Sequence, residues 1–175
     1  SLLKNNIDVA TVFTHKDDKN ENIWFKSVVD YCSLNSIPYY YSEELNNKEM
    51  YNLITQIKPI TIFSFWYRSI LSKEILSFPK NGAVNLHGSL LPKYRGRAPI
   101  NWQIINGEKK SGVTLAYMTA QPDAGEIISR EKVPIADTDT PLDLYIKLEK
   151  AASKLLNKSI KSIVKGLKAF FGKLT

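Results

Sequence analysis

The sequence NGAVNLHGSLLPKYRGRAPINW, residues 81–102, joins a short apolar strand to a long loop. After an Asn-Gly turn, Val84 and Leu86 alternate with polar residues, which is typical of a buried strand. Asn85 and His87 are two positions apart, so an extended chain places their side chains on one face. Glycine and proline interrupt the pattern from residue 88 onward, which predicts that the chain leaves the sheet there.

The amide of Asn85 and the imidazole of His87 form a pair of polar groups at the expected end of this strand. An amide N–H can hold a carbonyl oxygen as it gains negative charge, and an imidazole can donate a proton or accept one from an attacking amine. The pair therefore suits acyl-type transfer. A histidine with a purely structural role fits the same spacing, and the spacing alone leaves that alternative open.

Segments with strand and helix periodicity alternate along the chain. Strands are predicted at 7–13, 38–41, 60–65, around Val84 and Leu86, and at 112–118 and 126–135. Helices are predicted at 23–34, 43–57, 100–105 and 142–166. This order indicates an α/β fold with a mainly parallel sheet, whose last two strands are antiparallel. Ligands of such folds bind beyond the carboxyl ends of the strands, so the residues after 65 and the Asn85/His87 pair should share one crevice.

The final helix has a start signal of its own. Thr140 is expected to cap it, with Pro141 at the first helical position and Asp143 at the third.

Composition is that of an ordinary globular domain: 175 residues, 43% hydrophobic and 23% charged. The one cysteine, Cys32, excludes an internal disulfide framework and favours a reducing, cytoplasmic setting, and its apolar surroundings indicate a small buried side chain. No apolar run approaches the length of a membrane span, and the N-terminus does not resemble an export signal. Two histidines and one cysteine at these positions do not have metal-ligand spacing.

The net charge of +7 is concentrated at the C-terminal end, where residues 147–175 contain eight lysines and one glutamate. Such a patch can attract nucleic acid or a phosphorylated ligand. The lysines lie between apolar residues at helical spacing, without interleaved aromatics or arginines, which favours a solvated helix face.

Three motifs in order resemble the folate-dependent formyltransferases: NLHGSLLPKYRGRAPINW at 85–102, GVTLAYM at 112–118 and QPDAGEI at 121–127. This family includes the methionyl-tRNA, glycinamide ribonucleotide and sugar N-formyltransferases. The resemblance extends from about residue 7 to about residue 165. It implies a Rossmann-like, mainly parallel twisted sheet with helices on both faces, a catalytic domain at 1–166 and a short further segment at 167–175. The family's opening strand is expected to be missing from this sequence.

The resemblance also implies site residues. The family's N-x-H and D-x-G motifs place the catalytic roles on Asn85, His87 and Asp123, although Asp123 by itself fits a turn former equally well. Contacts to 10-formyltetrahydrofolate, the formyl donor, are expected from Phe65, Trp66, Tyr67, Ile70, Leu71, Leu90, Ala124 and Gly125. Contacts to the acceptor are expected from Ser89, Tyr94, Arg95 and Arg97. One departure is Ala116, where many relatives have histidine.

Within the family, the loop PKYRGRAPINW and the stretch FSFWYRSILSKEIL at 63–76 resemble the sugar-nucleotide enzymes. Their substrates include UDP-4-amino-4-deoxy-L-arabinose and dTDP-linked 4-amino-4,6-dideoxy sugars, which implies a role in O-antigen, lipopolysaccharide or lipid A biosynthesis. Two alternatives stay open: a methionyl-tRNA formyltransferase that uses the lysine-rich helix, and a non-catalytic module that binds folate or a sugar nucleotide. The expected partners are folate and a sugar nucleotide rather than nucleic acid or a membrane, and related enzymes often form homodimers.

Overall fold

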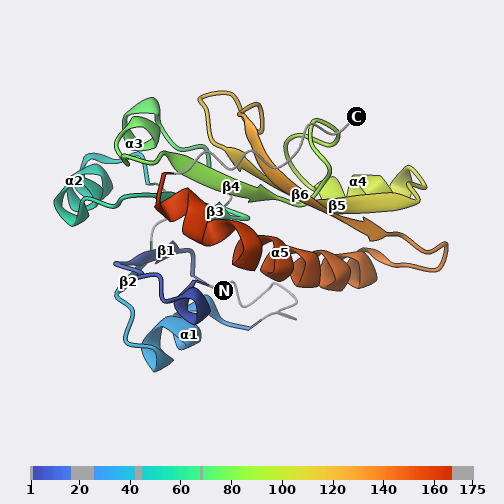
Figure 1. The fold of residues 1–175 in the computed structure, drawn as a ribbon, viewed down its shortest axis with the longest axis horizontal. Coiled ribbons are helices and arrows are strands. Elements are labelled where there is room, and N and C mark those ends of the chain that lie inside the picture. Colours follow the sequence, from blue (N-terminus) through green and yellow to red (C-terminus); the bar gives the residue numbers. More distant parts are fainter. Residues whose placement is uncertain (1, 17–25, 42–44, 68, 167–175) are drawn as a thin grey trace.

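The computed structural model describes residues 2–16, 26–41, 45–67 and 69–166 (Figure 1). The predicted C-terminal segment 167–175 lies outside these residues. A short 3-10 helix, η1 (Leu3–Asn5), precedes the other elements. In chain order they are β1 (Val12–Thr14), α1 (Val28–Leu34), β2 (Tyr39–Tyr41), α2 (Lys48–Ile57), β3 (Ile62–Phe65), α3 (Lys73–Ser77), β4 (Ala83–His87), α4 (Pro99–Ile105), β5 (Lys110–Tyr117), β6 (Ile127–Pro134) and α5 (Pro141–Val164).

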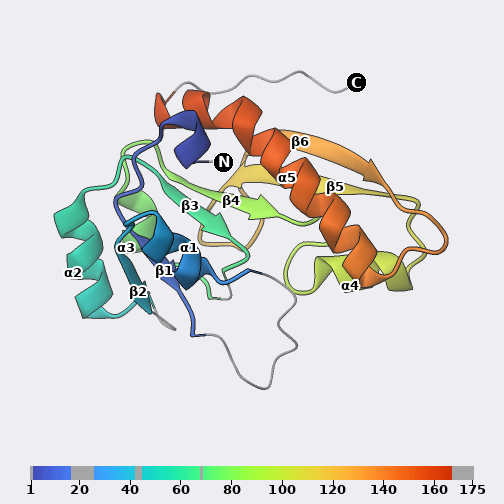
Figure 2. The same ribbon diagram turned by 90° about the horizontal axis from the view of Figure 1, so that it is seen from below.

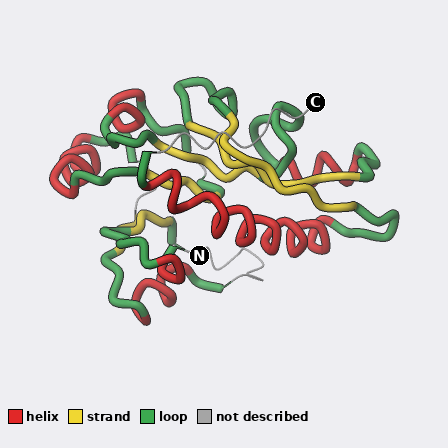
Figure 3. Tube along the Cα trace, in the orientation of Figure 1, coloured by secondary structure: helices red, strands yellow, loops and turns green. Residues whose placement is uncertain are grey.

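The strands form two sheets, and Figure 3 shows them in yellow beside the long last helix. β1 pairs in parallel with β2, and the second sheet has the order β3-β4-β5-β6. In it β3 and β4 are parallel, whereas β4 pairs with β5 and β5 with β6 in antiparallel orientation. The α/β fold class is confirmed, as is the antiparallel pairing of the last two strands.

Helices cover both faces of the four-stranded sheet. Phe63 of β3 and Tyr117 of β5 pack against the core beneath α5, which contains Val84 and Leu86. Ile62, the neighbour of Phe63, packs on the opposite side in a second cluster with residues of α2 and α3. Because successive strand residues face opposite ways, these contacts assign α5 to one face and α2 with α3 to the other. Figure 2 shows α5 running across the strands.

Both ends of α5 are stabilised by side chains. Thr140 and Asp143 form the predicted capping box, in which each side chain accepts a hydrogen bond from the other residue's backbone N–H. At the other end, Asn81 donates its amide to the carbonyl of Val164 over 2.6 Å. Since Asn81 lies just before β4, this bond ties the end of α5 to the start of the strand that carries Asn85 and His87.

The starts of three elements differ from the sequence prediction by five residues, and helix α3 was not predicted. The first strand begins at Val12 rather than at residue 7, because residues 7–11 do not join the β1–β2 ladder. The helix predicted at 43–57 begins at Lys48, where the Asn47 side chain accepts a bond from the backbone of Met50 and caps it. The helix predicted at 23–34 begins at Val28 after the cap Ser27, and residues 23–25 lie outside the described ranges.

The lysine-rich face of α5 carries several ion pairs. Lys154 and Lys158 both pair with Glu131 of β6, and Lys147 pairs with Asp139. These contacts support the interpretation of a solvated helix face, because part of its positive charge is neutralised within the domain. None of the helices in the described part of the chain is both long and apolar enough to cross a membrane.

We expect Glu131→Gln to remove an acid-dependent part of the stability. The hydrogen bond from Lys154 and the charges of Lys154 and Lys158 lower the pKa of Glu131 below its ordinary value of 4.5. A lowered pKa stabilises the fold at pH values above 4.5, and this contribution is lost as the pH falls through the folded-state value. The variant should be less stable by about 0.5–1 kcal/mol at pH 7, and the difference should vanish in acid. Urea unfolding from pH 7 to pH 3, with the exposed Glu49→Gln as control, measures this; a pH-independent difference contradicts it.

Candidate active site

Strand β4 separates apolar from polar side chains by simple alternation. Val84 and Leu86 enter the core beneath α5, so Asn85 and His87 face the other side of the sheet. The antiparallel neighbour β5 places Ala116 opposite Asn85 and Thr114 opposite His87. His87 is only 7% exposed, whereas Asn85 is half-buried and accessible to a ligand. The predicted common face is therefore present.

Asp123 reaches both of these residues from the loop between β5 and β6. Its Oδ1 accepts a hydrogen bond from Asn85 Nδ2 at 3.0 Å, and its Oδ2 lies 3.4 Å from His87 Nδ1. The backbone at Asp123 is left-handed, with φ of 50°. This conformation is uncommon for residues other than glycine, though aspartate is among those that adopt it more often. The structure thus brings the three predicted catalytic residues together across 38 positions of sequence.

Both ring nitrogens of His87 are engaged. Nε2 lies 2.7 Å from the carbonyl oxygen of Tyr94, and Nδ1 faces the Asp123 carboxylate. Neither oxygen can donate a hydrogen, so each contact is a hydrogen bond only when the facing nitrogen carries a proton. The imidazolium form, with a proton on both nitrogens, satisfies both contacts at once. The two contacts therefore hold the His87 ring in one orientation.

Asn85 keeps one donor for a ligand. Its amide nitrogen carries two hydrogens, and Asp123 accepts one of them. The other has no hydrogen-bond acceptor among the described residues. A half-buried N–H on the same face as the His87 ring can stabilise negative charge on the oxygen of a tetrahedral acyl intermediate.

The loop that follows β4 is held by buried hydroxyl groups. Ser89 is fully buried and donates its hydroxyl to the carbonyl of Lys93 at 2.6 Å. Thr114 of β5 donates to the carbonyl of Ser89 and accepts from the backbone N–H of Leu91. Ser89 was predicted to contact the acceptor. The structure corrects this, because a side chain without exposed surface, whose hydroxyl is bound inside the loop, shapes the loop instead.

Sequence reasoning missed Gln103, a buried residue of α4. Its Nε2 donates to the carbonyls of Gly88 and Pro99, and its Oε1 accepts from the hydroxyl of Ser111. Gln103 therefore fixes both ends of the loop relative to β5. The only signal in the sequence was a polar residue on the apolar face of a short helix, which does not by itself indicate a partner.

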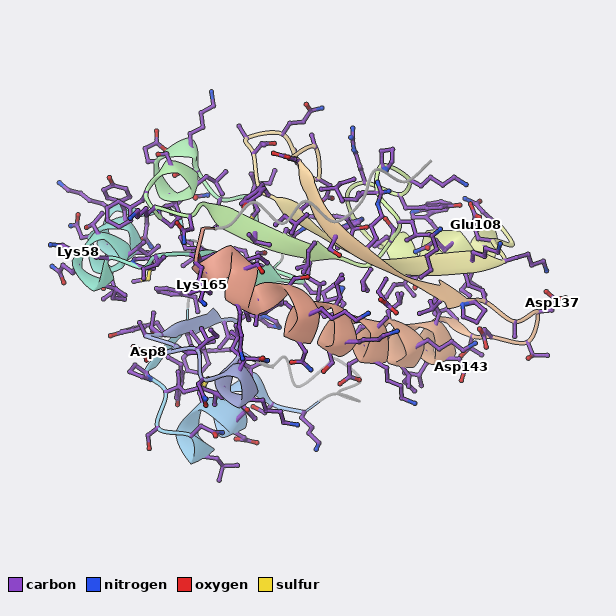
Figure 4. All side chains as sticks on the ribbon, viewed as in Figure 1. Asp8, Lys58, Glu108, Asp137, Asp143 and Lys165 are labelled. Carbon is purple, nitrogen blue, oxygen red and sulfur yellow. The ribbon has the colours of Figure 1, made fainter. Side chains whose placement is uncertain are left out.

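Three of the predicted acceptor contacts lie in the exposed part of the loop. Arg95 and Arg97 flank Gly96 and are exposed, and neither has an ion-pair partner among the described residues. Tyr94 is half-buried, and its hydroxyl donates to Glu108 Oε1 at 2.9 Å. This bond, followed by the ammonium of Lys93, lowers the pKa of Glu108 below its ordinary value. Figure 4 labels Glu108 at the turn between α4 and β5.

The residues predicted to hold the formyl donor fall into three groups: exposed, buried and half-buried side chains. Phe65 and Trp66 are exposed at the end of β3, and the Trp66 indole lies against Gly88, next to His87, and against Tyr145 of α5. Ile70 is 62% exposed. Leu71, only 3% exposed, belongs to the cluster of α2 and α3 and cannot contact a ligand in this conformation, which corrects that prediction. Tyr67, Leu90, Ala124 and Gly125 are half-buried.

Gly125 is required by a close backbone approach. A carbon added at its Cα would lie 1.8 Å from the carbonyl oxygen of Tyr117, so no other residue fits without movement of the chain. This contact closes the turn that presents Asp123.

Two other features of the described residues bear on the site. Histidine, cysteine and acidic side chains do not gather there into a group that could hold a metal ion. A surface hollow between β2 and α2 is lined by Tyr40, Glu49, Met50, Asn52, Leu53 and Gln56, none of which is a predicted site residue.

Comparison with known proteins identifies both a family and a fold. Residues 1–160 match the protein family described as formyl transferase. Among solved structures, phosphoribosylglycinamide formyltransferase from Bacillus halodurans has a TM-score of 0.76 and 24% identity, over 97% of this chain and 90% of that one. Identity at this level establishes likeness of fold alone.

Two sugar enzymes have higher identity. WlaRD, a sugar 3N-formyl transferase solved with dTDP and 5-N-formyl-THF, has a TM-score of 0.75 and 28% identity, over 99% of this chain and 60% of that one. An N-formyltransferase from Helicobacter canadensis, solved with folinic acid and dTDP-3-aminofucose, has a TM-score of 0.75 and 30% identity, over 95% of this chain and 58% of that one. This chain therefore spans less than two thirds of the length of either enzyme.

Proposed function

Because this chain belongs to the formyl transferase family, we propose that it transfers a formyl group from 10-formyltetrahydrofolate to the amino group of a nucleotide-linked amino sugar. That it is a folate-dependent formyltransferase follows from the family and from relatives solved with folate compounds. The identity of the acceptor is our proposal. The observation that carries the chemistry is the contact of Asp123 with both Asn85 and His87 at the end of β4.

Each of these three residues has a distinct role in the proposed reaction. The donor supplies a formyl carbon bonded to a nitrogen of the folate. The free N–H of Asn85 and the protonated ring of His87 stabilise the oxyanion that develops when the acceptor amine attacks this carbon. Asp123 holds both donors in place and balances the charge of the ring. The amine proton passes to water, and the folate nitrogen takes up a proton, from His87 or from water, as its bond to the formyl carbon breaks.

The end of β3 fits the aromatic part of a folate. Phe65 and Trp66 present exposed rings, with Trp66 adjacent to Gly88, and Ile70 adds an apolar surface nearby in the sequence. Flat apolar side chains of this kind suit a pterin ring. Ala124 and Gly125, in the turn that carries Asp123, form the proposed opposite wall together with Leu90 and Tyr67.

The exposed arginines provide the argument for a nucleotide sugar. Arg95 and Arg97 lie one residue on either side of Gly96, whose backbone N–H binds Asp123 Oδ2 at 2.9 Å. Guanidinium groups bind diphosphate oxygens in a bidentate manner, so the pair can hold the diphosphate of a dTDP- or UDP-linked sugar near the catalytic residues. The identities of 28% and 30% to WlaRD and to the H. canadensis enzyme support an acceptor of this class.

The identity of the acceptor is tested by direct assay of the protein with 10-formyltetrahydrofolate. The panel contains dTDP-3-amino, dTDP-4-amino and UDP-4-amino sugars, with glycinamide ribonucleotide and initiator tRNA as competing acceptors, and mass spectrometry detects the formamido product. We expect turnover with at least one sugar nucleotide and none with the other two classes. Formylation of tRNA, or of glycinamide ribonucleotide, in place of the sugars would refute the proposed acceptor. Binding of folate and sugar nucleotide without turnover would indicate the non-catalytic module.

We further propose that residues 1–166 form the catalytic domain and that the enzyme works in the cytoplasm as a homodimer, where it supplies formamido sugars for O-antigen or other lipopolysaccharide. These proposals rest on the family resemblance, and size-exclusion chromatography with light scattering tests the dimer.

A further inference from the structure

The tripeptide Tyr94-Arg95-Gly96 contacts both members of the His–Asp pair through its backbone. The carbonyl of Tyr94 accepts from His87 Nε2 at 2.7 Å, and two residues later the N–H of Gly96 donates to Asp123 Oδ2 at 2.9 Å. Asp123 Oδ2 is also the oxygen that faces His87 Nδ1. One short segment of loop therefore touches the catalytic histidine on one side and its carboxylate partner on the other.

Side-chain bonds from outside the site hold this segment in place. The Tyr94 hydroxyl donates to Glu108 Oε1 at 2.9 Å and accepts from Asn106 Nδ2 at 3.2 Å. Tyr94 has a left-handed backbone, with φ of 58°, and Gly96 has φ of 89°. Because a tyrosine rarely adopts this conformation by itself, the bonds of its side chain compensate for the unfavourable backbone.

We propose that Tyr94 and Glu108 are positioning residues of the formyl-transfer site. This inference rests on the proposed function above. Glu108 holds the Tyr94 side chain, and the Tyr94 carbonyl in turn fixes the ring orientation and the Nε2 proton of His87. Tyr94 thus acts through its backbone, and its hydroxyl points to Glu108 rather than to the acceptor. This replaces the role of acceptor contact that its sequence position suggested.

The physical basis of the proposal is the orientation and the tautomer of the His87 ring. An imidazole without a partner on Nε2 can rotate or adopt the other tautomer, whereas a fixed carbonyl at 2.7 Å requires a proton on that nitrogen. Loosening the loop removes this requirement and lets the ring leave the orientation in which it faces both Asp123 and the Tyr94 carbonyl. The variants should therefore lower kcat and leave KM nearly unchanged, because the ring is misoriented in the transition state while the surfaces that bind the substrates stay intact.

Nuclear magnetic resonance of the free protein tests the proposal without any substrate. The chain contains two histidines, His15 and His87, so a protein labelled with ¹⁵N at histidine gives two ring systems, and His15 serves as the internal reference. In the wild type we expect His87 Nε2 to be protonated and its hydrogen to exchange slowly with water. Tyr94→Phe and Glu108→Ala should both speed this exchange and shift the His87 ring signals, and the His15 signals should stay in place.

Two further variants isolate the bond between Tyr94 and Glu108. Glu108→Gln keeps an oxygen that accepts from the tyrosine hydroxyl and should restore the wild-type His87 signals. Lys93→Ala removes the ion pair to Glu108, at 3.3 Å, and leaves the tyrosine bond intact, so it should also resemble the wild type. Tyr31→Phe on α1 is the matched control for loss of an exposed tyrosine hydroxyl.

The kinetic test is a double-mutant cycle. Tyr94→Phe and Glu108→Ala should each lower kcat by about ten- to a hundredfold with little change in the KM of either substrate. The double variant should be no worse than either single one, because both changes break the same bond. A rise in the KM of the acceptor for Tyr94→Phe alone would assign the hydroxyl to substrate binding and overturn the proposal.

The positioning role and the proposed function can be refuted independently of each other. If the wild type transfers formyl groups and Tyr94→Phe and Glu108→Ala leave both kcat and the His87 signals unchanged, the positioning role is wrong and the proposed function stands. If the His87 signals respond as expected and no acceptor is formylated, the proposed function is wrong. The hydrogen-bond relay through Tyr94 would then be a structural device of the loop.

Discussion

We expect His87→Ala to lower kcat for formyl transfer by about 10²- to 10⁴-fold, the range typical of loss of a proton-transfer group. The ring of His87 is contacted by both the Asp123 carboxylate and the Tyr94 carbonyl, and it lies on the same face of β4 as the Asn85 amide. Alanine removes the imidazole and leaves the surfaces that bind the substrates. KM values should therefore change much less than kcat.

The control for this experiment is His15→Ala, which removes the other histidine of the chain, near the end of β1. Circular dichroism and binding of a folate analogue show whether His87→Ala is folded. Steady-state kinetics with the sugar nucleotide identified in the acceptor panel gives the two parameters. A folded His87→Ala enzyme with a kcat within about threefold of the wild type would rule out the catalytic role, since general acid–base groups contribute far more than that.

Gly125→Ala should have the largest effect on the fold near the site. Its methyl group would lie 1.8 Å from the backbone carbonyl oxygen of Tyr117, and no side-chain rotation can relieve this contact because the position of a Cβ is fixed by the backbone. We expect a loss of stability above about 3 kcal/mol, at the upper end for overpacking. Because Asp123 is two residues away in the same turn, formyl transfer should fall even in the fraction that remains folded.

Gly107→Ala is the matched glycine control. An added methyl group at Gly107 meets no atom within 4 Å, but the backbone is left-handed, with φ of 63°. Its cost should be about 1–2 kcal/mol, from conformation alone. Urea unfolding of the two variants compares them directly. Equal losses of stability would contradict the close approach at Gly125.

The two glycines also mark a limit of sequence reasoning. Gly107 follows a short helix, a position where a left-handed glycine is expected from local rules. The φ of Gly125 lies outside the left-handed region, and its requirement comes from Tyr117, eight positions earlier on a different segment. No local pattern in the turn predicts a collision with that carbonyl.

The polar residues of the site divide in the same way. The shared face of Asn85 and His87 follows from a strand period of two, and the capping box of α5 follows from residues three positions apart, so both were predictable from short spacings. The proposed site residues that lie on loops were harder to predict. Ser89 and Leu71 were assigned to ligands by position in the sequence, and their burial depends on Thr114, Lys93 and the α2–α3 cluster.

The amino-acid sequence by itself determined the α/β class, the order of most elements, the common face of Asn85 and His87 and the start of α5, because each follows from the backbone periodicity or from neighbours within one turn. Only the tertiary structure decided how Asp123 contacts the pair, that the Tyr94 carbonyl binds His87 and the Gly96 N–H binds Asp123, and that Gln103 and Thr114 hold the loop. These contacts connect residues that are distant in sequence, or depend on how a loop with left-handed residues folds back. Packing of the whole domain, rather than any local preference, brings them within hydrogen-bond distance.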